Sequence, residues 1–390
     1  GIKGALPIIL EGVNKEKRNF IFPLENLREI AENGEGNFYP FNNLKQVITY
    51  ITNDDLLPYK ENIHKEKVGK CKINYSEIIG QVEAKRAMEI AAAGRHNIYM
   101  FGSPGVGKTM LANAITSILP PLTKNEEMEV AKIYSIAGFS REMETLDIPF
   151  RAPHHTITKS ALIGGGRELT LGEITLAHNG VLFLDEILEY KREILELLRK
   201  PMEEGYISIT RQHERFILPS KFLLISASNP CPCGNWMSTE GKKCKCTEME
   251  IHKYINKLSS AIIDRMDLLC FIPRVRPEEL LNGNEKYTSE KMKERILSAI
   301  ERASYRLKDT DYRYNSEIVG KDIYRLCSIT SKARRILEKC YISYGISLRA
   351  YGKIIKVART MADLQEEEKI TEDNIIESLG YRKNIFGEIV

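Results

Sequence analysis

Residues 102–109 have the residue types that hold a chain of phosphates. They read GSPGVGKT, which fits the pattern G-x-x-x-x-G-K-[ST]. Small residues allow backbone N–H groups to face phosphate oxygens, and a helix that begins there adds the positive end of its dipole. The lysine reaches the β- and γ-phosphates, and the threonine hydroxyl is a ligand for Mg²⁺. The residues expected to bind ATP are Gly102, Ser103, Pro104, Gly105, Val106, Gly107, Lys108 and Thr109.

Two acidic residues, Asp185 and Glu186, follow an apolar run at 181–184. If that run is a parallel strand, both carboxylates emerge at its carboxyl end, where open parallel sheets bind ligands. We expect Asp185 to hold Mg²⁺, through water, and Glu186 to orient or deprotonate the water that attacks the phosphate. Asn229 follows another apolar run and could help to position that water; the alternative is a turn-forming asparagine before a proline.

Four of the eight cysteines fall in one short stretch as two C-x-C pairs, Cys231 with Cys233 and Cys244 with Cys246. In a chain with no export signal, such clustering indicates a metal rather than disulfides. Four thiolates close a tetrahedral site and leave no position for water, so the pattern predicts a structural Zn²⁺. Four reduced free thiols are the alternative.

Strand and helix patterns alternate around these residues, as they must if the residues are to meet at one site. Residues 96–101 form a buried-strand pattern that leads into the glycine-rich turn, and a helical pattern follows at 108–119. Two further apolar runs, at 180–184 and 222–226, are typical of parallel strands. From about residue 277 helical periodicity takes over. The sequence therefore predicts an α/β core with a parallel sheet, followed by an α-helical lid.

Length and composition indicate a soluble globular protein of two or three domains, with 390 residues of which 43% are hydrophobic and 28% charged. The net charge of +4 is too small to argue for nucleic acid by itself. No apolar run approaches a membrane span and no signal-peptide layout opens the chain, so we expect a cytoplasmic protein with no membrane partner. The first residue is Gly and the opening stretch already reads as mid-domain, so we expect the natural chain to be longer.

We expect four parts along the chain. They are a first unit at 1–65, a lysine-rich linker at 66–75, a core at 76–276 that contains the cysteine insertion at 231–246, and the helical lid at 277–390.

Several longer motifs point to one family. They are FRAPHH at 150–155, ALIGGG at 161–166, GEITLAH at 172–178, NPCPCG at 229–234 and SLRA at 347–350. With them the chain resembles the magnesium-chelatase-like AAA+ ATPases of the ComM/YifB type, from residue 1 to about 382. The resemblance implies a homo-hexameric ring in which each ATP site is completed by residues of the neighbouring subunit.

The resemblance also implies roles for two arginines. Arg265, in the segment IDRMD at 263–267, corresponds to the family's arginine finger, whose guanidinium stabilises charge on the γ-phosphate in the transition state. The alternative is an arginine bridged to a neighbouring aspartate. The second sensor arginine of the lid corresponds to Arg349, which we expect to bind nucleotide.

A β-hairpin precedes the first sensor strand in this branch of ATPases, and residues 207–211 and 215–218 fit its two strands. In related helicases such hairpins face the pore of the ring and touch DNA phosphates. Arg211, His213 and Arg215 are therefore the expected DNA contacts, and a merely solvated charged tip is the alternative.

Residues 1–58 resemble the C-terminal half of the protease domain of Lon. The place of the Lon catalytic lysine is occupied by Gly4-Ala5-Leu6, without a lysine, and the half that would hold the serine is absent. We therefore expect no proteolysis and interpret this unit as a structural or protein-contacting platform.

The resemblance implies a Mg²⁺-dependent ATPase that remodels DNA, as a helicase or branch-migration factor in recombination or natural transformation. Its partners would be DNA and recombination or competence proteins. The alternatives are a metal-chelatase motor subunit and a chaperone-like remodeller of protein complexes. The cysteine insertion and the Lon-like unit favour the first function, because plain chelatase motor subunits resemble only the central part of the chain.

Overall fold

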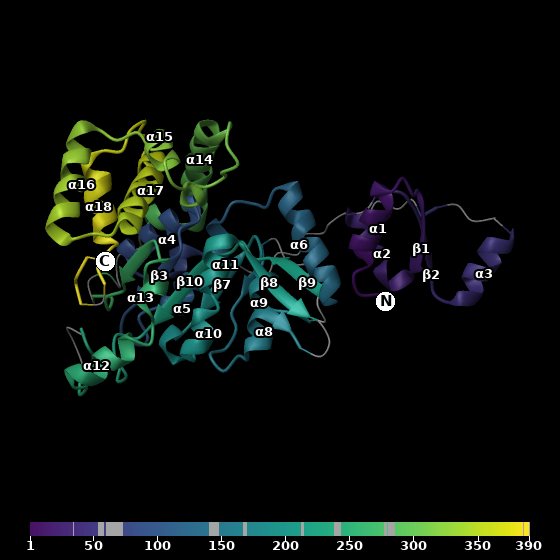
Figure 1. Cartoon of the computed structure of the whole chain (residues 1–390), viewed down its shortest axis with the longest axis horizontal. Helices are drawn as coiled ribbons and strands as arrows, with labels where there is room; N and C mark the ends of the chain where they lie inside the picture. Colours follow the sequence, from purple (N-terminus) through teal and green to yellow (C-terminus); the bar gives the residue numbers. More distant parts are fainter. Residues whose placement is uncertain are drawn as a thin grey trace.

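The computed structural model describes residues 1–33, 35–53, 58–59, 73–139, 148–166, 170–211, 214–237, 243–276, 279, 285–384 and 386–389. Figure 1 shows an N-terminal unit at one side of the molecule, a central α/β core and a helical region that contains the C-terminal part of the chain. Most of the linker expected at 66–75 lies outside the described residues.

The N-terminal unit is a small α/β structure. Its elements are α1 (Ala5–Asn14), β1 (Asn19–Pro23), η1 (Leu24–Asn26), α2 (Leu27–Asn33), β2 (Asn37–Phe41) and α3 (Leu44–Asn53). Strands β1 and β2 pair in parallel, with Phe20 opposite Phe38. Ala5, Ile9, Phe22, Ile30 and Phe38 form its core.

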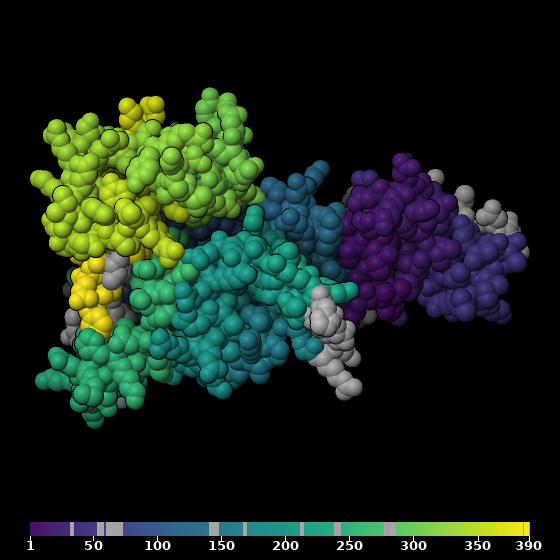
Figure 2. Space-filling view, in the orientation of Figure 1, coloured from purple at the N-terminus to yellow at the C-terminus, as the bar shows by residue number. Residues whose placement is uncertain are grey.

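This unit is attached to the rest of the molecule through helix α6 (Lys124–Ala137). The N–H of Gly4 donates to the carbonyl oxygen of Ser135 at 2.9 Å. The N–H of Leu6 donates to the hydroxyl of the same serine at 3.3 Å. The space-filling view shows the unit as a lobe beside α6 (Figure 2).

The core is built on a five-stranded parallel sheet in the order β11-β3-β10-β7-β4. The strands are β3 (Ile98–Phe101), β4 (Phe150–Arg151), β7 (Val181–Leu184), β10 (Leu223–Ser228) and β11 (Leu268–Phe271). Strands β3, β7 and β10 are buried throughout, as expected for parallel strands covered on both faces. Because β10 lies between β3 and β7, the loops that follow these three strands emerge side by side.

Helices cover both faces of the sheet. Helices α4 (Val82–Gly94) and α5 (Lys108–Ile118) pack on the face that contains Ile98 and Met100. The opposite face contains Tyr99 and Phe101, as the alternation of side chains along a strand requires. It is covered by η3 (Ile187–Glu189), α10 (Arg192–Glu196), α12 (Glu248–Ile255) and α13 (Ser260–Ile263). Helix α11 (Arg199–Glu204) follows α10 and leads into the hairpin formed by β8 (Tyr206–Arg211) and β9 (Glu214–Pro219).

Helices and short loops make up the C-terminal region. Its α-helices include α14 (Ser289–Leu307), the short α15 (Asp322–Leu326), α16 (Ser331–Tyr344), α17 (Leu348–Leu364) and α18 (Glu372–Gly380). In the described part of this region the β pairing consists of isolated bridges. The prediction of an α/β core with a parallel sheet, followed by a helical lid, is confirmed.

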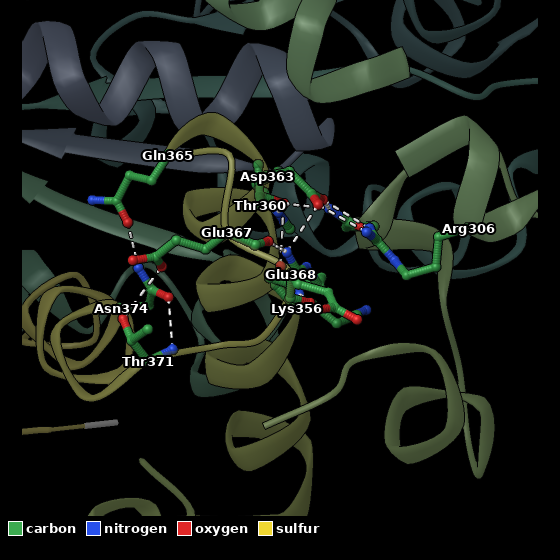
Figure 3. A network of polar contacts seen from close by, with 12 residues as sticks. Arg306, Lys356, Thr360, Asp363, Gln365, Glu367, Glu368, Thr371 and Asn374 are labelled. Carbon is green, nitrogen blue, oxygen red and sulfur yellow. Dashed lines mark hydrogen bonds and ion pairs between the residues drawn. The ribbon is translucent and has the colours of Figure 1, made fainter. Parts of the chain in front are cut away.

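A buried polar network holds the lid together (Figure 3). Arg306 on α14 donates to both carboxylate oxygens of Asp363 on α17, at 2.8 and 2.7 Å. Asn315 donates to Asp363 at 2.8 Å and to the hydroxyl of Thr360 at 3.0 Å. That hydroxyl also lies 2.8 Å from the imidazole of His96 in the core. Because a buried carboxylate is unfavourable unless it is paired, these contacts fix the position of α17 against α14 and the sheet.

A second contact joins the lid to the core at Asp267. The ammonium of Lys353 on α17 donates to Asp267 at 2.7 Å, and the backbone N–H of Asn97 donates to its other oxygen at 2.9 Å. Burial alone would raise the pKa of Asp267, but the charges of Lys353 and its neighbours lower it to about 2. Arg382 donates to the carbonyl of Met266 at 2.7 Å. The ion pair between Lys353 and Asp267 therefore holds the segment after α13 against α17.

Candidate active site

The glycine-rich turn leaves β3 and enters α5 in the way that phosphate binding requires. Gly105 and Gly107 have φ angles of 79° and 94°, a left-handed backbone that favours glycine. A Cβ added at either position would meet nothing within 4 Å, so the space beside these two residues is open. The first-turn N–H groups of α5 have no partner within the helix and are free to meet an anion.

Lys108 reaches back across this turn. Its ammonium donates to the carbonyl oxygens of Gly102 and Ser103 at 2.6 and 2.9 Å, and to the amide oxygen of Asn229 at 3.3 Å. Burial lowers the pKa of Lys108 to about 8, against the opposing effect of the carboxylates of Asp185 and Glu186. The ammonium group of Lys108, which would bind the phosphates, is thus held at the glycine-rich turn by these hydrogen bonds.

Thr109 and Asp185 bring two hard oxygen ligands together. The threonine hydroxyl donates to the carboxylate of Asp185 at 2.8 Å, although 76 residues separate them. Oxygen donors of this kind suit Mg²⁺, which needs few protein ligands because phosphates and waters complete its shell. The two residues therefore fit a magnesium ion bound beside the phosphates.

Glu186 has an uncommon backbone conformation for its type. Its φ angle is 49°, in the left-handed region, and its N–H donates to the carboxylate of Asp185 at 2.9 Å. Its side chain is 54% exposed, and one carboxylate oxygen lies 3.9 Å from Nδ1 of His155. Such local strain is typical of functional sites, where surrounding contacts maintain it.

Lys108, Thr109, Asp185, Glu186 and Asn229, which were predicted to act in ATP hydrolysis, therefore share one site, whereas Arg265 and Arg349 lie elsewhere. Both arginines contact Glu203 on α11, at 2.6 and 3.2 Å. Arg349 was predicted to bind nucleotide, and in the structure its ion pair is with Glu203. The aspartates beside Arg265 were the alternative partners in the sequence, and the ion pair is instead with Glu203.

The two C-x-C pairs converge on one point. The Sγ atom of Cys231 lies 3.4 Å from Cys233 and 3.8 Å from Cys244, and the latter two are 3.6 Å apart. With Cys246, all four sulfur atoms lie within 4.8 Å of one another. Zn–S bonds of ~2.3 Å in a tetrahedron place sulfur atoms about 3.8 Å apart, so the cluster fits a zinc ion.

The cysteine cluster also touches the phosphate loop. A Cβ added at Gly234, next to Cys233, would lie 2.6 Å from two ring carbons of Pro104. On the other side of the cluster, Asn229 accepts the hydrogen bond from Lys108. The cysteine segment and the phosphate loop therefore pack as one unit.

Only part of the expected DNA-contacting hairpin can be described. Arg215 on β9 is exposed, and its Nε donates to the hydroxyl of Ser208 at 2.7 Å. The side chain of Arg211 and all of His213 lie outside the described residues. The adjacent histidines His154 and His155 have ring centres 4.0 Å apart, and Nδ1 of His155 lies 3.9 Å from the carboxylate of Glu186.

Sequence reasoning missed two residues that contact predicted site residues, one beside the phosphate loop and one away from it. Gln81, only 5% exposed, donates to the carbonyl of Val106 in the phosphate loop at 3.2 Å and to Pro273 at 2.8 Å. The carboxylate of Glu203 forms ion pairs with Arg265 and Arg349. A lone glutamine before a helix and a glutamate within a charged helix are ordinary surface patterns, so neither residue stands out in the sequence.

Comparisons with known proteins show what the chain is similar to. Residues 74–280 match the family model described as magnesium chelatase, subunit ChlI, and residues 286–382 match the model of its C-terminal part. The competence protein ComM of Haemophilus influenzae is 38% identical over 98% of this chain and 75% of its own length. An uncharacterized protein YifB of Escherichia coli is 35% identical over 98% of this chain and 74% of its own length. The magnesium-chelatase subunit ChlI of Guillardia theta is 23% identical over 40% of this chain and 51% of its own.

Among the described residues, no helix combines the length and the apolar composition that crossing a bilayer requires.

Proposed function

The chain belongs to the magnesium-chelatase-like family of AAA+ ATPases, and from this premise we propose that it is a Mg²⁺-dependent ATP-hydrolysing ring motor that remodels DNA. One observation supports the ATPase part above all others. Lys108 and Thr109 begin helix α5, whereas Asp185 and Asn229 follow strands β7 and β10, and hydrogen bonds join the four residues in two pairs.

Each residue then has a role that its position supports. Lys108 and the backbone of the glycine-rich turn bind the β- and γ-phosphates. Thr109 and Asp185 would hold Mg²⁺, which supplies charge neutralisation for the phosphates. Glu186 accepts a proton from the attacking water, and Asn229 holds that water beside the γ-phosphate. The guanidinium of Arg265 from the neighbouring subunit stabilises charge that develops on the γ-phosphate oxygens.

Removing the proposed general base tests this assignment. Glu186→Gln should bind ATP as the unaltered protein does and lose at least about a hundredfold in turnover, because general-base catalysis contributes roughly 10²–10⁴-fold. Glu189→Gln is the matched control: it removes a carboxylate three residues away that pairs with Lys257 at 3.7 Å. Turnover by Glu186→Gln equal to that of the control would show that another residue activates the water.

DNA remodelling is the finer part of the proposal. It is supported by the exposed Arg215 on the β8–β9 hairpin and by the similarity to ComM, which is named a competence protein. We expect forked DNA to stimulate ATP hydrolysis. Arg215→Ala should weaken DNA binding. The slope of the logarithm of the binding constant against the logarithm of salt concentration should fall by about 1, as expected for the loss of one phosphate contact. Arg302→Ala, which removes an arginine paired with Glu366 at 3.0 Å in the lid, should leave binding unchanged.

The same assay separates the alternatives. A metal-chelatase motor or a chaperone-like remodeller would hydrolyse ATP at a rate that no DNA structure changes and that only a protein partner stimulates. The chelatase alternative is supported by the description of the matching family model. The chelatase subunit from Guillardia theta supports it less, because that protein aligns with only 40% of this chain.

We further propose that the cysteine cluster holds one structural Zn²⁺, supported by the sulfur–sulfur distances of 3.4–3.8 Å. Elemental analysis should find one zinc per chain after purification without added metal. Cys244→Ser should lose it, whereas Cys340→Ser, which alters a half-buried thiol in the lid, should retain it.

A further inference from the structure

Glu203, near the end of α11, joins two arginines that come from different parts of the chain. One carboxylate oxygen, Oε1, lies 2.6 Å from Nη2 of Arg265 and 3.2 Å from Nη2 of Arg349. Arg265 follows α13 in the core, and Arg349 stands in the first turn of the lid helix α17. The two guanidinium groups therefore approach each other to within about 6 Å, and both form ion pairs with the same carboxylate oxygen.

The backbone beneath both arginines is fixed. Lys353 lies one helical turn after Arg349, and it is ion-paired at 2.7 Å to Asp267, two residues after Arg265. Both partners of this ion pair are buried. Since the backbone cannot easily separate the arginines, two like charges are held close together, and a neighbouring anion must offset their repulsion.

The contacts of Arg265 also satisfy only some of the hydrogen-bond donors of its guanidinium group. Its side chain is 9% exposed, and besides Glu203 it donates to the carbonyl of Ala261. Its Nε has no hydrogen-bond partner among the described residues. A buried donor without a partner is unfavourable, so the site would gain free energy from an anion with more acceptor atoms than Glu203 offers.

A carboxylate oxygen between two guanidinium groups has the geometry and charge of a phosphate oxygen bound by arginines. We propose that Glu203 occupies, in the free subunit, the place that phosphate oxygens of the neighbouring subunit's nucleotide take in the ring. Glu203 thereby competes with nucleotide for Arg265 and Arg349, and both arginines serve the same neighbouring site. The inference rests on the proposed ring ATPase and names a residue that controls its assembly.

The competition has a measurable consequence. Glu203→Gln keeps the size of the side chain and removes its charge, so both arginines are released more easily. The concentration of protein that gives half-maximal ATPase activity should fall roughly three- to tenfold, the range expected for losing two partly exposed ion pairs. Turnover at saturating protein and ATP should stay within about twofold of the unaltered protein, because Glu203 is absent from the assembled site.

A matched control stands next to it on the same helix. Glu204 is 40% exposed and pairs with Lys200 at 3.4 Å, away from both arginines. Glu204→Gln should leave both the half-maximal protein concentration and the turnover unchanged. In a chain that also carries Arg265→Ala, Glu203→Gln should lose most of its effect, since the arginine it would release is gone.

Two outcomes would overturn the inference. A fall in saturating turnover comparable to that of Arg265→Ala would mean that Glu203 supports the active arrangement instead of competing with it. An unchanged half-maximal concentration would mean that the ion pairs do not resist assembly. The thermal unfolding midpoint of each variant verifies that it is folded. If the unaltered chain hydrolysed no ATP at any concentration, the ring ATPase itself would be wrong, and this result is distinct from both of the others.

Discussion

Gly234 offers a way to disturb the phosphate loop without altering any residue proposed to bind nucleotide or zinc. Its φ angle is 75°, and the Cβ of an alanine would lie 2.6 Å from Cδ and Cγ of Pro104. An ordinary contact begins near 3.4 Å, so Pro104 or the cysteine segment must move by about 0.8 Å. Misplacement of a catalytic site by ~1 Å can lower the rate about a hundredfold. We expect Gly234→Ala to lower kcat/KM for ATP roughly ten- to a hundredfold.

An alanine in the left-handed backbone conformation also lowers stability, and this effect must be separated from the steric clash with Pro104. An alanine in this conformation costs about 1–2 kcal/mol wherever it occurs. Gly320 has a similar φ of 59°, and a Cβ added there would meet nothing within 4 Å. Gly320→Ala should therefore lose similar stability but keep its ATPase activity within about twofold.

The assay is steady-state ATP hydrolysis by both variants, with thermal unfolding and zinc content measured on the same samples. If Gly234→Ala keeps its zinc and hydrolyses ATP as well as Gly320→Ala does, then the cysteine segment does not position the phosphate loop. That result would refute the reasoning, whatever the stability of the two variants.

Three further predictions test other parts of the structure. Lys108→Ala should weaken ATP binding by at least about tenfold, since a charge-assisted contact to phosphate contributes about 1.5–3 kcal/mol, and unchanged affinity in a nucleotide titration would contradict its role. Arg265→Ala should be inactive alone but regain activity when mixed with Glu186→Gln, because some interfaces in a mixed ring combine an intact glutamate with an intact arginine; no recovery would argue against a shared site. Burial lowers the pKa of His96 to about 4, so the folded state binds fewer protons than the unfolded state between pH 6.5 and pH 4. Stability should therefore fall by up to about 3 kcal/mol as pH drops through that window, and thermal unfolding of His96→Gln should show a shallower dependence.

The local parts of the site were predictable from the sequence. The glycine-rich turn between β3 and α5, and the acidic pair after β7, depend on residues that are neighbours in the chain. Backbone freedom at glycine, burial of an apolar strand and the start of a helix are all properties of a few consecutive residues. The lid followed from helical periodicity for the same reason, and the cysteine cluster from the spacing of its ligands.

Contacts between distant segments needed the tertiary structure. Glu203 is 62 residues from Arg265 and 146 from Arg349, and nothing in the charged helix that contains it distinguishes it from its exposed neighbours. The contact of Gly234 with Pro104 likewise spans 130 residues. Sequence patterns state which residue types the chain has and which face of an element they share. Which of them meet is decided by how sheet, lid and insertion pack together, because packing free energy belongs to the assembled core and not to any one segment.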